Sequence, residues 1–234
     1  MKLNKKKVFV VALAVCLIAV LSLGTLAWFN ATDDITNTFK VTTDENNTDP
    51  EFSVDVSETD PETGAKDDDG VTYWNVLPGD VIGKDPKVTN TGDYTQWIRV
   101  TVTLANAAHW EQHGGSLAFT DLFSGSDYDL VANLGNTNAK WLLVEDAVTA
   151  DATTGDAVWY LYLNREFPAG SDELVFTEVH VPEDFDQNEV ADMGNEFSVK
   201  VSADAVQRDN TGDNAVEAFR TVNWPAGTAF ADVD

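Results

Sequence analysis

The chain has 234 residues, with 14 basic and 40 acidic side chains and a formal net charge of −26 at pH 7. A surface this acidic repels phosphate, so nucleic acid is excluded as an expected partner. Hydrophobic residues make up 43% of the sequence, including seven Trp and twelve Phe, which is too many for a disordered chain. We therefore expect one folded domain that is large enough to bury most of its apolar surface.

The first 27 residues have the layout of a secretory signal peptide. Four lysines and no acidic residue precede an apolar run over residues 8–23, and small residues follow it. Thr25 and Ala27 then occupy the positions three and one before the cut, and Trp28 becomes the new N-terminus. An uncleaved anchor is the alternative, although the apolar run is slightly short for a helix that spans a membrane.

Cleavage after Ala27 changes the chemistry of the chain. Cys16 is the single cysteine and lies in the removed segment, so the mature chain has no disulfide to stabilise it. It keeps 10 basic against 40 acidic side chains, a formal charge of about −30, and such a surface attracts divalent cations. Residues 66–70 (Lys-Asp-Asp-Asp-Gly) offer oxygen ligands for calcium but lack the spacing of a twelve-residue calcium loop, so we interpret them as an exposed loop.

The junction and several later stretches carry a resemblance to a known family. Residues 24–30 (Gly-Thr-Leu-Ala-Trp-Phe-Asn), followed by Asn37-Thr38-Phe39, resemble the junction of the TasA/camelysin family of exported bacterial proteins. Residues 77–80, 97–100 and 197–207 resemble its core and closing strands. The resemblance implies processing by a dedicated SipW-type signal peptidase, an extracellular location and a jelly-roll fold. Family members are fibre-forming biofilm matrix or cell-surface proteins, and some are described as metalloendopeptidases.

Residues 28–41 form a separate N-terminal segment that predicts an imperfect strand, because apolar residues recur at alternate positions. The residues of this apolar face are Phe29, Ala31, Ile35, Phe39 and Val41. Asp33 and Asn37 interrupt the pattern. The segment is either the first strand of the protein's own sheet, or a frayed terminus, or, as the resemblance implies, a donor strand that inserts into the next subunit. Phe29, Ile35, Phe39 and Val41 are the residues expected to enter the neighbour.

Residues 42–234 predict an all-β domain with minor helices. The clearest strand covers residues 96–105, where Ile98, Val100, Val102 and Leu104 alternate with polar or aromatic residues. Further strands are predicted at 52–56, 71–76, 140–145, 157–165, 173–181 and 196–203. Two stretches, 105–123 and 212–222, predict helices that pack on the sheets as lids. These elements indicate a two-sheet antiparallel sandwich, and the jelly-roll arrangement within that class comes from the resemblance.

One stretch is a candidate metal site. His109 and His113 lie four residues apart, so on a helix they face the same side and could share zinc. The stretch is not the His-Glu-x-x-His motif, since Glu111 comes two residues after the first histidine and points away from the pair. The sequence does not select a third ligand, and two ordinary surface histidines are the alternative interpretation.

Together these features predict a secreted, non-enzymatic structural protein that forms extracellular matrix fibres by donor-strand exchange. Its partners are expected to be further copies of itself and the signal peptidase, with membrane contact only through the signal peptide and no obligatory cofactor. A zinc metalloendopeptidase of camelysin type is one alternative function. A monomeric surface adhesin or ligand-binding module is the other.

Overall fold

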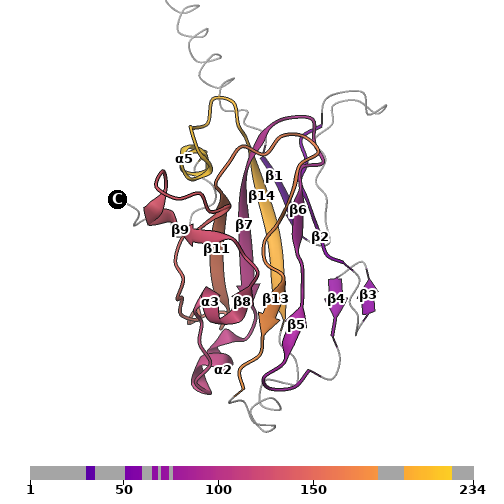
Figure 1. Cartoon of the computed structure of the whole chain (residues 1–234), viewed down its shortest axis with the longest axis vertical. Helices are drawn as coiled ribbons and strands as arrows, with labels where there is room; N and C mark the ends of the chain where they lie inside the picture. Colours follow the sequence, from indigo (N-terminus) through magenta and orange to yellow (C-terminus); the bar gives the residue numbers. More distant parts are fainter. Residues whose placement is uncertain are drawn as a thin grey trace, which may run out of the picture.

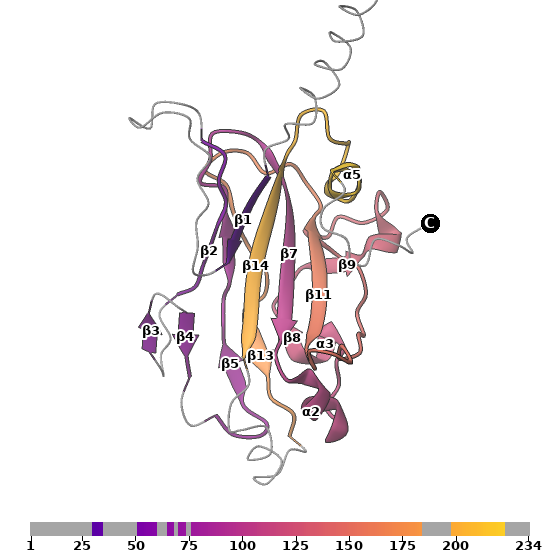
Figure 2. The same ribbon diagram turned by 180° about the vertical axis from the view of Figure 1, so that it is seen from behind.

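The computed structural model describes residues 30–34, 51–59, 65–67, 70–73, 76–183 and 198–222. Within these ranges the chain forms a β-sandwich of two layers, with short helices at one end and on one outer face (Figure 1). The view from behind shows the larger sheet with its central strands, β14, β7 and β11, running side by side (Figure 2). The expected all-β sandwich with minor helices is confirmed.

Six strands make the larger layer, in the spatial order β1-β14-β7-β11-β10-β9. Their bounds are Asn30–Asp34 (β1), Gln96–Leu104 (β7), Tyr128–Leu130 (β9), Trp141–Leu143 (β10), Ala157–Leu163 (β11) and Val199–Gln207 (β14). All neighbours are antiparallel except β9 and β10, which are parallel. β7 and β14 pair along their whole length, from Leu104 opposite Val199 to Gln96 opposite Gln207. This pair is the centre of the sheet.

The smaller layer is built on one long antiparallel ribbon that is interrupted in the middle. Its strands are Asp55–Ser57 (β2), Val81–Gly83 (β5), Lys87–Thr89 (β6), Phe123–Ser124 (β8), Asp172–Leu174 (β12) and Glu178–His180 (β13). β5 pairs with β13 and β6 with β12 in one continuous register. Two backbone hydrogen bonds cross the interruption, from Lys84 N to Thr177 O (3.0 Å) and from Val175 N to Pro86 O (2.9 Å). β2 and β8 flank this ribbon on opposite sides, and a separate hairpin joins Ala65–Asp67 (β3) to Gly70–Thr72 (β4).

The pairings are nested along the chain, which defines the topology. β1, the first described strand, pairs with β14, the last. Inside this pair, β5 and β6 pair with β13 and β12, and inside these β7 pairs with β11. The first half of the chain therefore folds back on the second half. Such nesting of hairpin partners across two sheets is the arrangement of a jelly roll. The sandwich is therefore jelly-roll-like, as the resemblance implied.

The main core lies between the two layers. Ile98, Val100, Val102 and Leu104 of β7 are all buried in it, as the alternation predicted. Aromatic rings fill the end of the core near α3 (Phe119–Leu122), where Phe119, Phe123, Trp159 and Phe176 pack with centroids 4.7–6.4 Å apart. This cluster joins the larger sheet to β8 and to the β12/β13 strand.

A second apolar cluster covers part of the outer face of the larger sheet. The helix α5 (Ala215–Thr221) lies there and buries Phe219 against Trp97 and Tyr162. Its N-cap is Asn214, whose side chain accepts a hydrogen bond from Glu217 N at 3.0 Å. The helix predicted at 212–222 is thus confirmed in type and place.

Other predicted elements differ from the structure. The stretch 105–123 forms two short helices, α2 (Ala107–Gln112) and α3, and not one. Between them Gly114 has a φ of +81°, which lies outside the helical region. Gly115 lies so close to Trp110 that a side chain at this position would collide with the indole ring. The turn-rich passage after residue 76 contains β5 and β6, and β14 extends to Gln207 rather than ending at 203. None of the helices in the described part of the chain is long and apolar enough to span a membrane.

Candidate functional site

The element that the fibre hypothesis requires is the edge of the larger sheet, where β1 lies against β14. Five residue pairs join the two strands, from Asn30 opposite Val206 to Asp34 opposite Ser202. Residues 30–34 thus occupy their own sheet in this structure, next to the closing strand (Figures 1 and 2). Of the predicted residues, the cleavage set Thr25, Ala27 and Trp28 and the donor set Phe29, Ile35, Phe39 and Val41 lie outside the described residues.

The β14 strand contributes small side chains to the core at this edge. Ala203 and Ala205 are fully buried, and their register partners on β1 are Asp33 and Ala31. A sheet edge without its outer strand exposes a row of backbone donors and acceptors, which another strand can pair with. Residues 202–206 of β14 are therefore the positions that β1, or an equivalent strand, has to cover.

A buried ion pair lies directly beside this edge. The Arg99 guanidinium binds Asp204 through Nη2 and Nε, at 2.6 and 3.1 Å, and the two residues are only 2% and 7% exposed. Asp204 sits between Thr32 and Arg99 in the sheet register, so the charge pair is one strand in from β1. The interior position makes each charge dependent on the other, because an isolated buried charge is costly.

Aromatic rings complete the surroundings of Arg99. Its guanidinium carbon lies 5.4 Å from the centroid of the Tyr160 ring and 5.1 Å from that of Phe219 on α5. Burial raises the pKa of Tyr160 and Tyr162, and the positive charge of Arg99 opposes this rise. The arrangement holds a cation between π faces, which stabilises it by about 0.5–2 kcal/mol for each such contact.

Alternation along residues 96–105 puts Arg99 on the strand face opposite Ile98 and Val100, but the sequence does not identify its partner. The signal was present, since a basic residue in a strand that is otherwise apolar or hydroxylic needs a carboxylate nearby. Asp204 was not identifiable among 40 acidic residues, because the register of β14 against β7 decides the pair.

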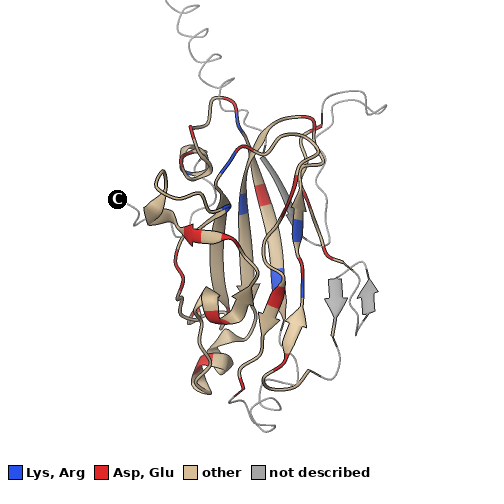
Figure 3. Cartoon of the chain, in the orientation of Figure 1, with Lys and Arg blue, Asp and Glu red and all other residues tan. Residues whose placement is uncertain are grey.

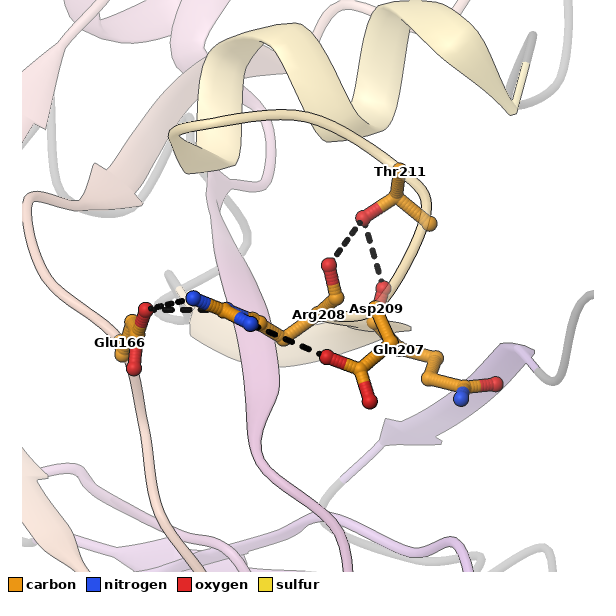
Figure 4. A network of polar contacts seen from close by, with 5 residues as sticks. All are labelled: Glu166, Gln207, Arg208, Asp209 and Thr211. Carbon is orange, nitrogen blue, oxygen red and sulfur yellow. Dashed lines mark hydrogen bonds and ion pairs between the residues drawn. The ribbon is translucent and has the colours of Figure 1, made fainter.

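A polar loop follows β14 at the same end of the sheet (Figure 4). Arg208 binds Glu166 at 2.8 Å and Asp209 at 3.1 Å, and these two acidic neighbours raise the pKa of Arg208. The hydroxyl of Thr211 donates to the carbonyls of Gln207 and Arg208 at 2.7 and 3.0 Å.

A shallow cavity of about 240 Å³ lies beside this loop. Its lining residues are Trp97, Glu166, Arg208, Asn210, Thr211, Gly212 and Asp213. Trp97 is only 4% exposed, so its ring offers no face on which a sugar could stack. Arg208, the one basic residue of the lining, is already paired with two carboxylates, and Asp213 adds a further acidic side chain, so the cavity offers no free positive charge to an anionic ligand.

The predicted histidine pair lies on α2 and at its C-terminal end. His109 is exposed on the helix, and His113 is the C-cap, with its N–H donating to the carbonyl of His109 at 3.3 Å. Glu111 does not join them, since its Oε2 accepts a hydrogen bond from Ala150 N at 3.2 Å. No group of three or more His, Cys, Asp or Glu side chains that could hold a metal occurs among the described residues. Zinc at this pair stays a prediction without a third ligand there, and Asp68 and Asp69 of the calcium alternative lie outside the described residues.

Acidic side chains are spread over both layers and their connecting loops (Figure 3). Comparison of the chain with protein-family models, with curated proteins and with solved structures found no match. The resemblance to the TasA/camelysin family therefore stays a hypothesis, supported by the residues of the export junction and the later stretches named above.

Proposed function

We propose that this chain is a secreted structural protein whose N-terminal segment, freed by cleavage after Ala27, joins subunits into extracellular fibres. The observation that carries the proposal is the position of β1. It lies at the very edge of the larger sheet and pairs with a single strand, β14. Its link to the next described strand, β2, spans the stretch from Asp34 to Asp55, so its sheet position is not fixed by a tight turn.

The physical basis is exchange of identical strands. A β1 segment from a second copy offers the β14 edge the same backbone groups and the same side chains as the chain's own β1, so the two pairings have nearly equal energy per contact. Within one chain the covalent link favours self-pairing, and a high subunit concentration favours exchange. A subunit that gives its β1 to one neighbour and accepts β1 from another makes a head-to-tail contact that does not close, which builds a filament.

The acidic surface sets the conditions for assembly. With 10 basic against 40 acidic side chains after cleavage, a formal charge of about −30, neighbouring subunits repel one another at neutral pH. Added salt or divalent cations reduce this repulsion, so assembly is expected to be faster in calcium than in dilute buffer. The fibre is then a product of strand pairing, with electrostatics controlling its rate.

Engineered disulfides test where β1 pairs. The mature chain has no cysteine, so Asp34→Cys/Ser202→Cys gives a single bond across β1 and β14, whose residues are register partners. In fibres the exchange predicts bonds between chains, seen as a ladder on a non-reducing gel, and in dilute monomer a bond within one chain. The matched control is Thr101→Cys/Ser202→Cys across β7 and β14, which bonds within one chain in both samples.

Two results would overturn the proposal. One is a β1–β14 disulfide that stays within single chains in well-formed fibres. The other is undiminished fibre formation, by negative-stain electron microscopy, from a chain that lacks residues 28–41. Monomers that persist at all concentrations would instead favour the surface adhesin or ligand-binding module.

A further inference from the structure

Three polar side chains converge on the outer face of the smaller layer, away from the β1 edge. Ser124 Oγ lies 2.5 Å from Glu178 Oε2 and 3.0 Å from His180 Nε2, and the latter two atoms are 3.8 Å apart. The register explains the cluster, since Ser124 is opposite Glu178 and His180 follows two positions later on the same side of β13. Val179 between them points into the core, where it is 3% exposed.

The arrangement does not suit serine hydrolysis. In a Ser-His-acid triad the carboxylate binds the histidine nitrogen that faces away from the serine. Here the carboxylate of Glu178 lies on the same side of the His180 ring as the hydroxyl, near Nε2. The glutamate therefore cannot orient the ring for proton transfer from Ser124.

The spacing suits two ligands of one zinc ion. Zinc binds His nitrogen and carboxylate oxygen at about 2.0–2.2 Å, so two tetrahedral ligands lie about 3.3–3.6 Å apart. His180 Nε2 and Glu178 Oε2 are within a few tenths of an ångström of this separation, and both side chains are partly exposed, at 39% and 49%, so they can adjust. Ser124 donates to the carboxylate, as the outer partners of metal ligands commonly do.

The described residues of one copy supply two of the four ligands of a closed zinc site. Structural zinc takes four protein ligands, and the described residues provide no third histidine or carboxylate here. A second copy facing the first through a twofold axis would add its own histidine and glutamate. Val81, the register partner of His180, is 53% exposed beside the cluster and gives this contact an apolar neighbour.

We propose that zinc bound by His180 and Glu178 joins two copies of this chain face to face through their smaller layers. The cation offsets part of the repulsion between two acidic subunits. The contact is isologous, because each copy gives the same two ligands, and it uses a different surface from the β1–β14 edge. In fibres it would join filaments side by side, independently of how subunits join along the filament.

The test is zinc titration of the chain that begins at Trp28, followed by sedimentation velocity and metal analysis at low protein concentration. We expect an EDTA-reversible dimer with about one zinc ion for two chains, as a four-ligand site shared by two copies requires. His180→Ala and Glu178→Gln should each weaken the zinc-dependent association at least tenfold. The double variant His109→Ala/His113→Ala is the matched control and should dimerise as the parent does.

Strand exchange needs no metal, so only the EDTA-reversible fraction reports on this site. Unchanged zinc-dependent dimerisation of His180→Ala would overturn the proposal, as would zinc binding without association. A dimer lost in the His109→Ala/His113→Ala control and kept in Glu178→Gln would assign zinc to α2 instead. Circular dichroism of each variant confirms that the β-sandwich is intact before its association is compared.

Discussion

The two faces of the larger sheet are stabilised by different kinds of contact. The inner face packs aliphatic and aromatic side chains against the smaller layer. The outer face is covered in part by a single seven-residue helix, and beneath it the sheet holds the Arg99–Asp204 ion pair between aromatic rings. Further along β7 on that outer side, Thr101 and Thr103 are half-buried. Burial of apolar area therefore stabilises the inner face, whereas a paired charge and the short helix α5 stabilise the outer face.

The largest expected effect comes from the inner face. Trp159 is 1% exposed, packs edge-on against Phe119 and Phe123, and donates from Nε1 to the carbonyl of Asp146 at 3.0 Å. Trp159→Ala should lower the free energy of unfolding by about 3–5 kcal/mol. Val158→Ala, on the opposite side of the same strand, is the control and should cost about 1 kcal/mol or less. Equal losses for the two variants in urea unfolding would contradict the division between the faces.

The ion pair gives the next largest effect. Asp204→Asn removes the charge that balances buried Arg99, so we expect a loss of about 3 kcal/mol in the free energy of unfolding. The double variant Arg99→Met/Asp204→Leu removes both charges and should be more stable than the single variant. Denaturant unfolding of this double variant and of its two single variants, Arg99→Met and Asp204→Leu, completes a thermodynamic cycle that measures the coupling. Additive losses would show that the pair is not coupled.

Alkaline pH tests one buried and three half-buried tyrosines, which lie on both sides of the larger sheet and beside the smaller layer. Burial raises the pKa of Tyr128, Tyr160 and Tyr162 above 10.0, and it raises the pKa of Tyr73 to about 12, with Glu58 and Asp85 adding to the rise. Below pH 10 these phenols are neutral in both states and stability does not depend on them. As pH rises from 10 to 12 the unfolded chain loses phenol protons first, so stability falls.

Unfolding measured across this range, together with phenolate absorbance, checks the expectation. Tyr73 donates to the carbonyl of Gly83 at 2.7 Å, and Tyr73→Phe should remove part of the pH dependence. A parent protein whose stability is flat between pH 10 and 12 would show that the phenols ionise freely in the folded state.

The smallest effect is expected at the lid. Asn214→Ala removes the N-cap of α5 and should destabilise the protein by about 1 kcal/mol. Asn214→Asp restores an acceptor at the same position and should recover most of this loss. Thermal unfolding followed by Trp fluorescence measures both variants, and identical melting of Asn214→Ala and parent would show that the cap does not hold α5 in place.

The sequence predicted the elements whose pattern is regular over several turns or residues. β7 alternates over nine residues, and α5 has apolar residues at helical spacing, so both were found. The segments β5 and β6 were missed because each has three residues and lies among prolines and glycines. They are strands because β12 and β13, which come much later in the chain, pair with them. A local sequence pattern does not contain this tertiary contact.

The polar sites were harder to predict than the strands. The Ser124, Glu178 and His180 cluster depends on the register of β8 against β13, and the Arg99–Asp204 pair on that of β14 against β7. Alternation tells which side of a strand a residue takes but not which residue of another strand stands opposite. The chain has 40 acidic residues, so the sequence alone does not show which of them pairs with a given basic residue.

The nested topology also separates the synthesis of the two edge strands in time. Asn30 and Val206 are neighbours in the sheet but about 176 positions apart in the chain (206 minus 30). At about 5–20 residues per second, roughly 9–35 seconds pass between synthesis of the first strand and synthesis of its partner. During that interval β1 has been made and β14 has not. The first strand therefore has to wait for its sheet partner, which is supplied only by one of the last described segments of the same chain.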